Sequence, residues 1–261
     1  MKTTVAVILV AGIGSRLRPI TDDRPKALVD IGGETILGRT MRLLASYGVR
    51  KVVLATGYRE DAVRAAVQGS TSVVTDMTDM TGVVGIEQVE YCRNPEFDRT
   101  QNSVSLALCR GALGSDAFFK LDGDVVFQRQ VLERLDASTA DLAVAVDAGR
   151  MLDAEAMKVT VSGVNISAFG KGIALAESAG ESIGIERIRG NASSTLFEAM
   201  DTAIAGGETG LYYEDFYSRL IEKGALSAEA VPVADLAWTE VDDFSDLERA
   251  RELVRGFPAE G

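Results

Sequence analysis

The stretch that most constrains the fold is an apolar run near the start of the chain, Val5 to Val10, followed at once by a glycine-containing turn, Ala11 to Arg16. A continuous apolar run rich in β-branched residues is typical of a strand that is buried on both faces. Glycines after such a strand allow a tight turn and let backbone N–H groups approach a ligand closely. The stretch therefore predicts a central strand that ends in a binding loop.

Positive charge gathers directly behind this turn. Arg16, Arg18, Arg24 and Lys26 follow one another closely in a chain whose formal net charge is −12. Backbone donors and local positive charge together favour an anion, and phosphate is the natural candidate. The acidity of the whole chain argues against a general nucleic-acid surface, because phosphate backbones need a basic face.

Histidine is absent from the 261 residues, which excludes Ser-His-Asp and Cys-His catalysis and histidine-rich zinc sites. Cys92 and Cys109 follow no disulfide or metal-binding spacing. No apolar run approaches the ~20 residues needed to cross a bilayer, and the N-terminus has no signal-peptide pattern. We therefore expect a cytoplasmic enzyme, without membrane insertion, that uses carboxylates, lysines, arginines, backbone groups and a hard metal ion.

Strand-like and helix-like segments alternate along most of the chain. Helical patterns are predicted at 36–47, 60–67, 105–113, 193–205, 213–223 and 246–255, and strands at 49–55, 86–93, 117–121, 141–147, 231–233 and 237–241. The polar segment 69–82 is predicted to be an irregular surface loop. This alternation predicts an α/β fold with a doubly wound, mostly parallel, Rossmann-like sheet.

The middle of the chain has a different character. Residues 158–161 and 165–170 are predicted to form a hairpin, and 182–189 another short strand. We expect this small antiparallel subregion to pack against one edge of the sheet, close to the ligand. No linker with a shift in composition separates it from the rest, so a single domain over residues 1–261 is expected.

Acidic residues follow two of the predicted strands. Asp122 and Asp124 flank Gly123 after the strand at 117–121, and open α/β sheets bind ligands at such strand ends. Carboxylates there suit Mg²⁺, which prefers one or two carboxylates with phosphate oxygens and water. Asp242 and Asp243 follow a late strand, and taken alone this pair predicts a helix cap.

Three phosphate-binding patterns compete for the first loop. The Walker pattern requires Gly-Lys-Ser/Thr, which is absent, and the dinucleotide fingerprint requires a third glycine where Leu17 stands. The third pattern, Leu-x-Ala-Gly-x-Gly-x-Arg-Leu-x-Pro followed by Pro-Lys, is matched at every fixed position by 9–19 and 25–26. The chain thus resembles the nucleotidyltransferases that join a nucleoside triphosphate to a sugar phosphate or phosphorylated alcohol.

Further motifs resemble the branch of this family that uses CTP with phosphocholine, inositol phosphate and related phosphoalcohols. They are Thr56-Gly57-Tyr58, Asn94-Pro95 with Asn102-Ser103, Tyr212-Tyr213-Glu214-Asp215, and Trp238-Thr239-Glu240-Val241-Asp242. Larger sugar nucleotidyltransferases usually carry Glu-Lys-Pro where Met157-Lys158-Val159 stands, which argues against a hexose phosphate. The resemblance implies a nucleotidyltransferase, glycosyltransferase-A-like fold.

The resemblance also implies roles for individual residues. The catalytic residues would be Arg16, Lys26 and Lys158, and Mg²⁺ would lie on Asp124 and Asp242. Nucleotide binding would involve Ala11, Gly12, Gly14, Ser15, Arg16, Lys26, Tyr58, Asn102, Ser103 and Asp122. Acceptor binding would involve Lys158, Tyr213, Glu214, Asp215, Trp238 and Glu240.

The expected reaction is attack of an acceptor phosphate or phosphonate oxygen on the α-phosphorus of CTP, with release of pyrophosphate. Two alternatives remain open, a sugar-1-phosphate nucleotidyltransferase using UTP, GTP or dTTP, and a catalytically silent nucleotide-binding regulatory subunit. The acceptor also stays open. The aromatic residues Tyr58, Tyr212, Tyr213 and Trp238 would suit a quaternary ammonium, whereas Glu214 and Asp215 would suit an amine or the hydroxyls of a cyclitol. A homodimer is compatible with the sequence.

Overall fold

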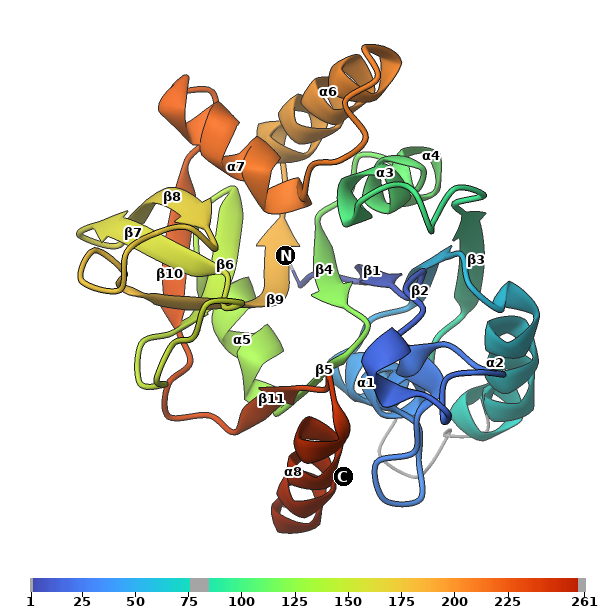
Figure 1. Ribbon diagram of the computed structural model, residues 1–261. Helices are drawn as coiled ribbons and strands as arrows, with labels where there is room; N and C mark the ends of the chain where they lie inside the picture. Colours follow the sequence, from blue (N-terminus) through green and yellow to red (C-terminus); the bar gives the residue numbers. More distant parts are fainter. Residues whose placement is uncertain (1, 76–84, 258–261) are drawn as a thin grey trace.

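The computed structural model describes residues 2–75 and 85–257 and contains a nine-stranded sheet (Figure 1). The strand order is β3-β2-β1-β4-β9-β6-β10-β8-β7. These strands are β1 (Val5–Leu9), β2 (Lys51–Thr56), β3 (Gln88–Arg93), β4 (Phe118–Asp122), β6 (Leu142–Asp147), β7 (Lys158–Ser162), β8 (Asn165–Gly170), β9 (Gly180–Ile188) and β10 (Ala228–Pro232). The short strands β5 (Val125–Phe127) and β11 (Trp238–Glu240) pair with each other beside it.

The sheet is mixed. Pairs β1–β2, β1–β4, β2–β3 and β6–β10 are parallel, whereas β9 runs antiparallel to both β4 and β6, and β8 runs antiparallel to β10. The predicted hairpin of β7 and β8 lies at one edge, as expected. The expectation that 182–189 also packs at the edge is wrong, because β9 lies inside the sheet, buried along almost its whole length. Its three charged residues, Glu181, Glu186 and Arg187, make this central strand hard to recognise in the sequence.

Helices cover both faces of the sheet. One apolar cluster includes side chains of α1 (Ile36–Tyr47), α2 (Glu60–Thr75) and α5 (Gln130–Ala137). The other includes side chains of α3 (Asn102–Ala107), α4 (Arg110–Leu113), α6 (Asn191–Ala205) and α7 (Tyr213–Glu222). A third cluster lies under α8 (Phe244–Gly256). No helix within the described residues is both long enough and apolar enough to span a membrane.

Several sequence predictions require correction. The segment 69–82 is not a loop throughout, because α2 continues to Thr75, and residues 76–82 lie outside the described part of the chain. The segment expected to be one helix over 105–113 is divided into α3 and α4. Strand β5 and helix α5 were not predicted, since three residues are too few for periodicity and α5 contains several charged residues.

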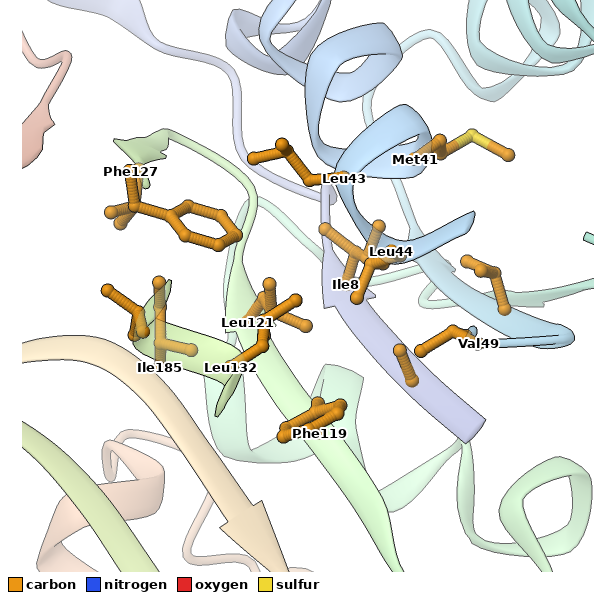
Figure 2. Packing of buried hydrophobic residues seen from close by; sticks show 14 of the residues in the cluster. Ile8, Met41, Leu43, Leu44, Val49, Phe119, Leu121, Phe127, Leu132 and Ile185 are labelled. Carbon is orange, nitrogen blue, oxygen red and sulfur yellow. The ribbon is translucent and has the colours of Figure 1, made fainter. Parts of the chain in front are cut away.

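The core beside α1 fixes the positions of the two strands that lead to the site. Figure 2 shows Ile8 of β1 next to Leu44 of α1, and Leu121 and Phe119 of β4 belong to the same cluster. Full burial of each such side chain contributes roughly 1.5–3 kcal/mol. The parallel register pairs the last residue of β1 with the last residue of β4, Leu9 with Asp122. The loops that follow the two strands therefore emerge side by side.

Candidate active site

The first loop turns sharply after β1. Gly14 has φ +69° and ψ 46°, the left-handed region that favours glycine. A Cβ at this position would lie 2.7 Å from Cβ of Lys26, so the lysine stem packs directly against the turn. The hydroxyl of Thr21 donates a hydrogen bond of 2.8 Å to the Gly14 carbonyl and closes the loop. Glycine is thus required both for the turn and for the close approach of Lys26.

The loop after β4 lies equally close to β1. The backbone N–H of Gly123 donates to the Leu9 carbonyl at 3.0 Å, and a Cβ on Gly123 would lie 2.4 Å from that oxygen. Only glycine fits between the two strand ends. This contact places Asp122 and Asp124 beside the first loop.

Four charged side chains meet between these loops. The Lys26 ammonium lies 2.5 Å from Oδ2 of Asp124 and 2.7 Å from Oδ1 of Asp242, and the Arg16 guanidinium lies 2.6 Å from Oδ2 of Asp242. Burial opposes the charged form of Lys26, but the two aspartates outweigh it and raise the pKa of the lysine. Burial likewise opposes ionisation of Asp242, yet Lys26 and Arg16 lower its pKa. Lys26 and Asp242 therefore stabilise each other's charged forms.

The neighbouring Asp243 has a different function. Its carboxylate accepts hydrogen bonds from the backbone N–H groups of Ser245 and Asp246, at 2.8 and 3.0 Å, and caps α8. The helix cap predicted for the Asp242-Asp243 pair is thus confirmed for Asp243, while Asp242 faces Lys26.

Three carboxylates lie close enough to share a cation. Oxygens of Asp124, Glu240 and Asp242 all lie within 4.8 Å of one another. Oδ1 of Asp124 is buried and has no hydrogen-bond partner. Although Glu240 is exposed in the cleft, its partial desolvation there, together with the charges of Asp124 and Asp242, raises its pKa to about 8. An all-oxygen donor set with an unpartnered oxygen suits a hard cation such as Mg²⁺.

Three cavities that share lining residues surround this cluster. The loop pocket, of about 290 Å³, is lined by Ala11, Gly12, Lys26, Phe97, Gln101, Asn102, Ser105, Asp122 and Asp124, among others. The open cleft, of about 790 Å³, is lined by Arg16, Lys26, Arg150, Lys171, Trp238, Asp242 and Arg249, among others. The acidic pocket, of about 120 Å³, is lined by Asn102, Asp122, Glu155, Lys171, Glu181, Tyr212, Glu214, Trp238 and Glu240, among others. Glu240 faces all three.

The loop pocket is lined by five of the ten predicted nucleotide-binding residues, namely Ala11, Gly12, Lys26, Asn102 and Asp122, whereas Arg16 lines the open cleft. Gly14 and Ser15 shape the turn without lining the pocket. The Tyr58 hydroxyl donates to the carbonyls of Thr21 and Asp22, at 3.1 and 2.7 Å, so this side chain supports the loop from outside. Ser103 is fully buried, and its hydroxyl donates to the Leu211 carbonyl at 2.6 Å.

Three of the predicted acceptor-binding residues line none of these cavities. The Lys158 ammonium is buried and donates to the Lys171 carbonyl at 2.8 Å, because β7 turns this side chain into the protein. Tyr213 is fully buried, and Asp215 accepts a hydrogen bond of 2.8 Å from the backbone N–H of Tyr212 at the start of α7. These three residues therefore support the wall of the site, whereas Glu214, Trp238 and Glu240 line it.

Sequence reasoning missed two cations of the site. Lys171, whose carbonyl is held by Lys158, lines both the open cleft and the acidic pocket, and its ammonium lies 3.0 Å from Glu155. The Arg150 guanidinium lies over the Trp238 ring, 4.7 Å from its centroid. Both residues are in irregular segments between strands, and no sequence pattern identified them.

A buried charged network lies beneath the acidic pocket, and the sequence reasoning missed it too. The fully buried Lys120 ammonium lies 2.9 Å from Glu186 and 3.2 Å from Asp122. The Tyr213 hydroxyl donates to the other Asp122 oxygen at 2.9 Å. A lysine inside the apolar strand β4 was the available signal for this network, because a fully buried lysine needs charged partners.

Known proteins share both the sequence pattern and the fold. Residues 6–220 match the family described as MobA-like NTP transferase domain. The chain is 34% identical over 255 residues to the CMP-5'-(3-aminopropyl)phosphonate synthase of Streptomyces rubellomurinus, covering 94% of this chain but only 38% of that protein. It is 26% identical to the CTP:phosphoglutamine cytidylyltransferase of Campylobacter jejuni, covering 93% of this chain and 97% of that protein. The fold is similar to the inositol-1-phosphate CTP transferase from T. maritima, with a TM-score of 0.76, 21% identity and 99% coverage of both chains.

Proposed function

Because the chain belongs to the MobA-like NTP transferase domain family, we propose that it is a magnesium-dependent cytidylyltransferase. It joins CTP to a small phosphorylated or phosphonate alcohol and releases pyrophosphate. The choice of CTP rests on the sequence relatives, one a CMP-phosphonate synthase and another a cytidylyltransferase. The loop resemblance alone leaves the nucleotide open.

The observation that carries this proposal is the meeting of the first loop with two distant aspartates. Lys26 contacts both Asp124 and Asp242, although 216 residues separate it from the latter. The loop pocket and the open cleft both border this point. A triphosphate that enters from the loop pocket would thus lie beside an acceptor that enters from the cleft.

Asp124 and Asp242, with Glu240 beside them, are the residues that would hold Mg²⁺. When bound, the ion would neutralise negative charge on the phosphate oxygens of both substrates. The protein itself supplies donors around it. The backbone N–H of Gly12 in the loop pocket and the Arg16 guanidinium in the open cleft bind the β- and γ-phosphates, and Lys26, which lines both cavities, stabilises charge on the α-phosphate.

The acceptor phosphate needs no general base, because its dianion is already a competent nucleophile. Catalysis therefore consists of positioning and charge stabilisation, which an active site without histidine can provide. In place of Lys158, Lys171 and Arg150 bind the acceptor phosphate, since both line the open cleft. Lys158 positions Lys171 through the hydrogen bond to its carbonyl.

The test is magnesium-dependent pyrophosphate release over a grid of nucleotides and acceptors. The nucleotides are CTP, UTP, ATP, GTP and dTTP, and the acceptors are phosphocholine, 2-aminoethylphosphonate, inositol phosphate and hexose 1-phosphates. We expect release with CTP and a small phosphorylated or phosphonate alcohol. Release only with a hexose phosphate would make the chain a sugar nucleotidyltransferase, and nucleotide binding without release from any pair would favour a silent subunit.

Adjacent aspartates provide a matched pair of variants. Asp242→Asn removes a charge that faces Lys26 and should lower turnover at least 100-fold. Asp243→Asn alters only the cap of α8, where asparagine also caps well, so activity should persist. Equal activity of the two variants would contradict the assignment of Asp242.

A further inference from the structure

The acidic pocket has a large excess of acidic over basic side chains. Five of its lining side chains are carboxylic acids, namely Asp122, Glu155, Glu181, Glu214 and Glu240. Among the described residues in the lining, Lys171 is the one cationic side chain, and its ammonium already pairs with Glu155. A small cavity with this charge balance favours a positively charged ligand group.

Among these carboxylic acids, Glu214 combines burial with an unpartnered oxygen. Its side chain is only 5% exposed, and its Oε2 atom has no hydrogen-bond partner. It lies in the first turn of α7 and lines the acidic pocket. A buried carboxylate oxygen without a partner costs free energy that a donor in the pocket would offset.

The neighbouring groups satisfy this carboxylate only in part, because its Oε2 atom has no hydrogen-bond partner. The Lys120 ammonium is engaged by Glu186 and Asp122, and the Tyr213 hydroxyl is engaged by Asp122. Burial, helped by the charges of Asp122 and Glu186 and opposed by Lys120, raises the pKa of Glu214 to about 8. An added cation would restore charge balance at this position.

We infer that the acidic pocket binds the primary ammonium group of the acceptor, with Glu214 as its main contact. This inference rests on the proposed function, because it names the acceptor class as a short aminoalkyl phosphonate or phosphate. Glu240 borders both this pocket and the carboxylate cluster at Asp124. The ammonium end of a short acceptor would thus lie at Glu214, and its phosphonate end beside Lys171, which lines both this pocket and the open cleft.

A quaternary ammonium in an aromatic cage fits less well. The rings of Tyr212 and Trp238 in the pocket wall already have protein cations over them, Lys171 at 5.4 Å and Arg150 at 4.7 Å from the centroids. Tyr213 is buried beneath Lys120, 3.5 Å away. A carboxylate, by contrast, accepts the N–H hydrogen bonds that a primary ammonium has and a trimethylammonium lacks.

A cyclitol is also disfavoured. At about 120 Å³, the acidic pocket is the smallest of the three cavities. Hydroxyl groups would also leave the excess negative charge of the pocket uncompensated. The charge and the size therefore favour the same acceptor class.

The test compares 2-aminoethylphosphonate with 2-hydroxyethylphosphonate, which has the same length but no charge at that end. With CTP and Mg²⁺, we expect kcat/KM of the wild-type protein to be at least 100-fold higher for the amine. Glu214→Gln should abolish most of this preference by lowering kcat/KM for the amine alone. Glu222→Gln, on the same helix but exposed, is the matched control and should change neither value.

Three results would overturn the inference. One is equal kcat/KM of the wild-type protein for the two phosphonates, and another is an equal loss for both in Glu214→Gln. The third is turnover of N,N,N-trimethyl-2-aminoethylphosphonate as fast as that of the primary amine. The first and the third use the wild-type protein, so the inference can be tested even if Glu214→Gln does not fold.

Calorimetric binding of the two phosphonates separates this inference from the proposed function. The ammonium site would be supported, even if no nucleotide reacted, by two results together. The wild-type protein would bind the amine at least tenfold more tightly than the alcohol, and Glu214→Gln would bind the two equally. Pyrophosphate release from CTP with the alcohol and the amine alike would support the proposed function and overturn the ammonium site.

Discussion

Replacing Lys26 with methionine tests the point where the first loop meets the two aspartates. Lys26→Met keeps an unbranched apolar stem and removes the ammonium that lies 2.5 Å from Asp124 and 2.7 Å from Asp242. The carboxylates of Asp124, Glu240 and Asp242 then remain close together with much less compensating charge. We expect a loss of stability without Mg²⁺ and a loss of turnover under all conditions.

The magnitude follows from the burial of these groups. Removing one partner of a buried ion pair costs about 3–5 kcal/mol. The three side chains are 15%, 20% and 24% exposed, and Arg16 still offsets Asp242, so screening lowers the expected loss to about 2 kcal/mol. Turnover should fall ~10²–10³-fold, as when one preorganised donor to developing charge is removed.

The assays are urea unfolding with and without Mg²⁺, and pyrophosphate release at saturating substrate concentrations. A ligand that binds only the folded state adds about 2.7 kcal/mol at 100 times its Kd. Because the ammonium no longer competes for the carboxylates, Mg²⁺ should stabilise Lys26→Met more than the wild-type protein.

Lys51→Met is the matched control, since Lys51 also pairs with a carboxylate, Glu90 at 2.8 Å, but lines none of the three cavities. Lys51→Met should lower the free energy of unfolding by less than about 1 kcal/mol and should keep full turnover. Near-normal turnover of folded Lys26→Met would refute the reasoning, and so would an Mg²⁺ response no larger than that of the wild-type protein.

Three further changes test the supporting structure. Gly123→Ala would place a Cβ 2.4 Å from the Leu9 carbonyl oxygen, so urea unfolding should show a loss of about 1–3 kcal/mol and turnover should fall at least tenfold. By the same assay, Lys120→Met should lower the free energy of unfolding by about 3–5 kcal/mol, because it leaves Glu186 without its buried partner. The double variant with Glu186→Met should recover a large part of this stability, whereas additive losses would contradict a buried ion pair. Although burial opposes ionisation of Asp136, hydrogen bonds from a threonine and a tyrosine lower its pKa below the usual 3.8. The ionised Asp136 therefore stabilises the folded state above pH 3.8, and this stabilisation is lost as the pH falls through the lowered pKa. In urea unfolding, the free energy of unfolding of the wild-type protein should be ~2 kcal/mol higher than that of Asp136→Asn at pH 7, and the difference should be smaller at pH 3.

Short-range features of the sequence were sufficient for the first loop and for most elements. The apolar run of β1, the glycine at position 14 and the helix from Ile36 to Tyr47 depend on local periodicity and backbone geometry, and the structure has them as predicted. The strand end with Asp122 and Asp124 was likewise predictable, because the sequence itself shows an acidic turn directly after an apolar run.

Predictions that depended on the direction of a side chain did not succeed as well. Lys158 was expected in the acceptor site, yet it is buried against the carbonyl of Lys171, and the latter faces the cleft. Both lysines are near ends of one hairpin, so only packing decides which ammonium reaches solvent and which is enclosed. The central position of β9 was also not predictable from local sequence, because it depends on pairing with β4 and β6, which are distant in the chain.

The sequence by itself therefore determined the strand, the glycine turn and the cations of the first loop, because these follow from neighbours along the chain. The tertiary structure decided which carboxylates they meet. Asp242 reaches Lys26 across 216 residues, whereas the adjacent Asp243 caps a helix. It also decided that Glu214 ends in an acidic pocket with an unpartnered oxygen. Long-range register and burial set these distances, and no local pattern encodes them.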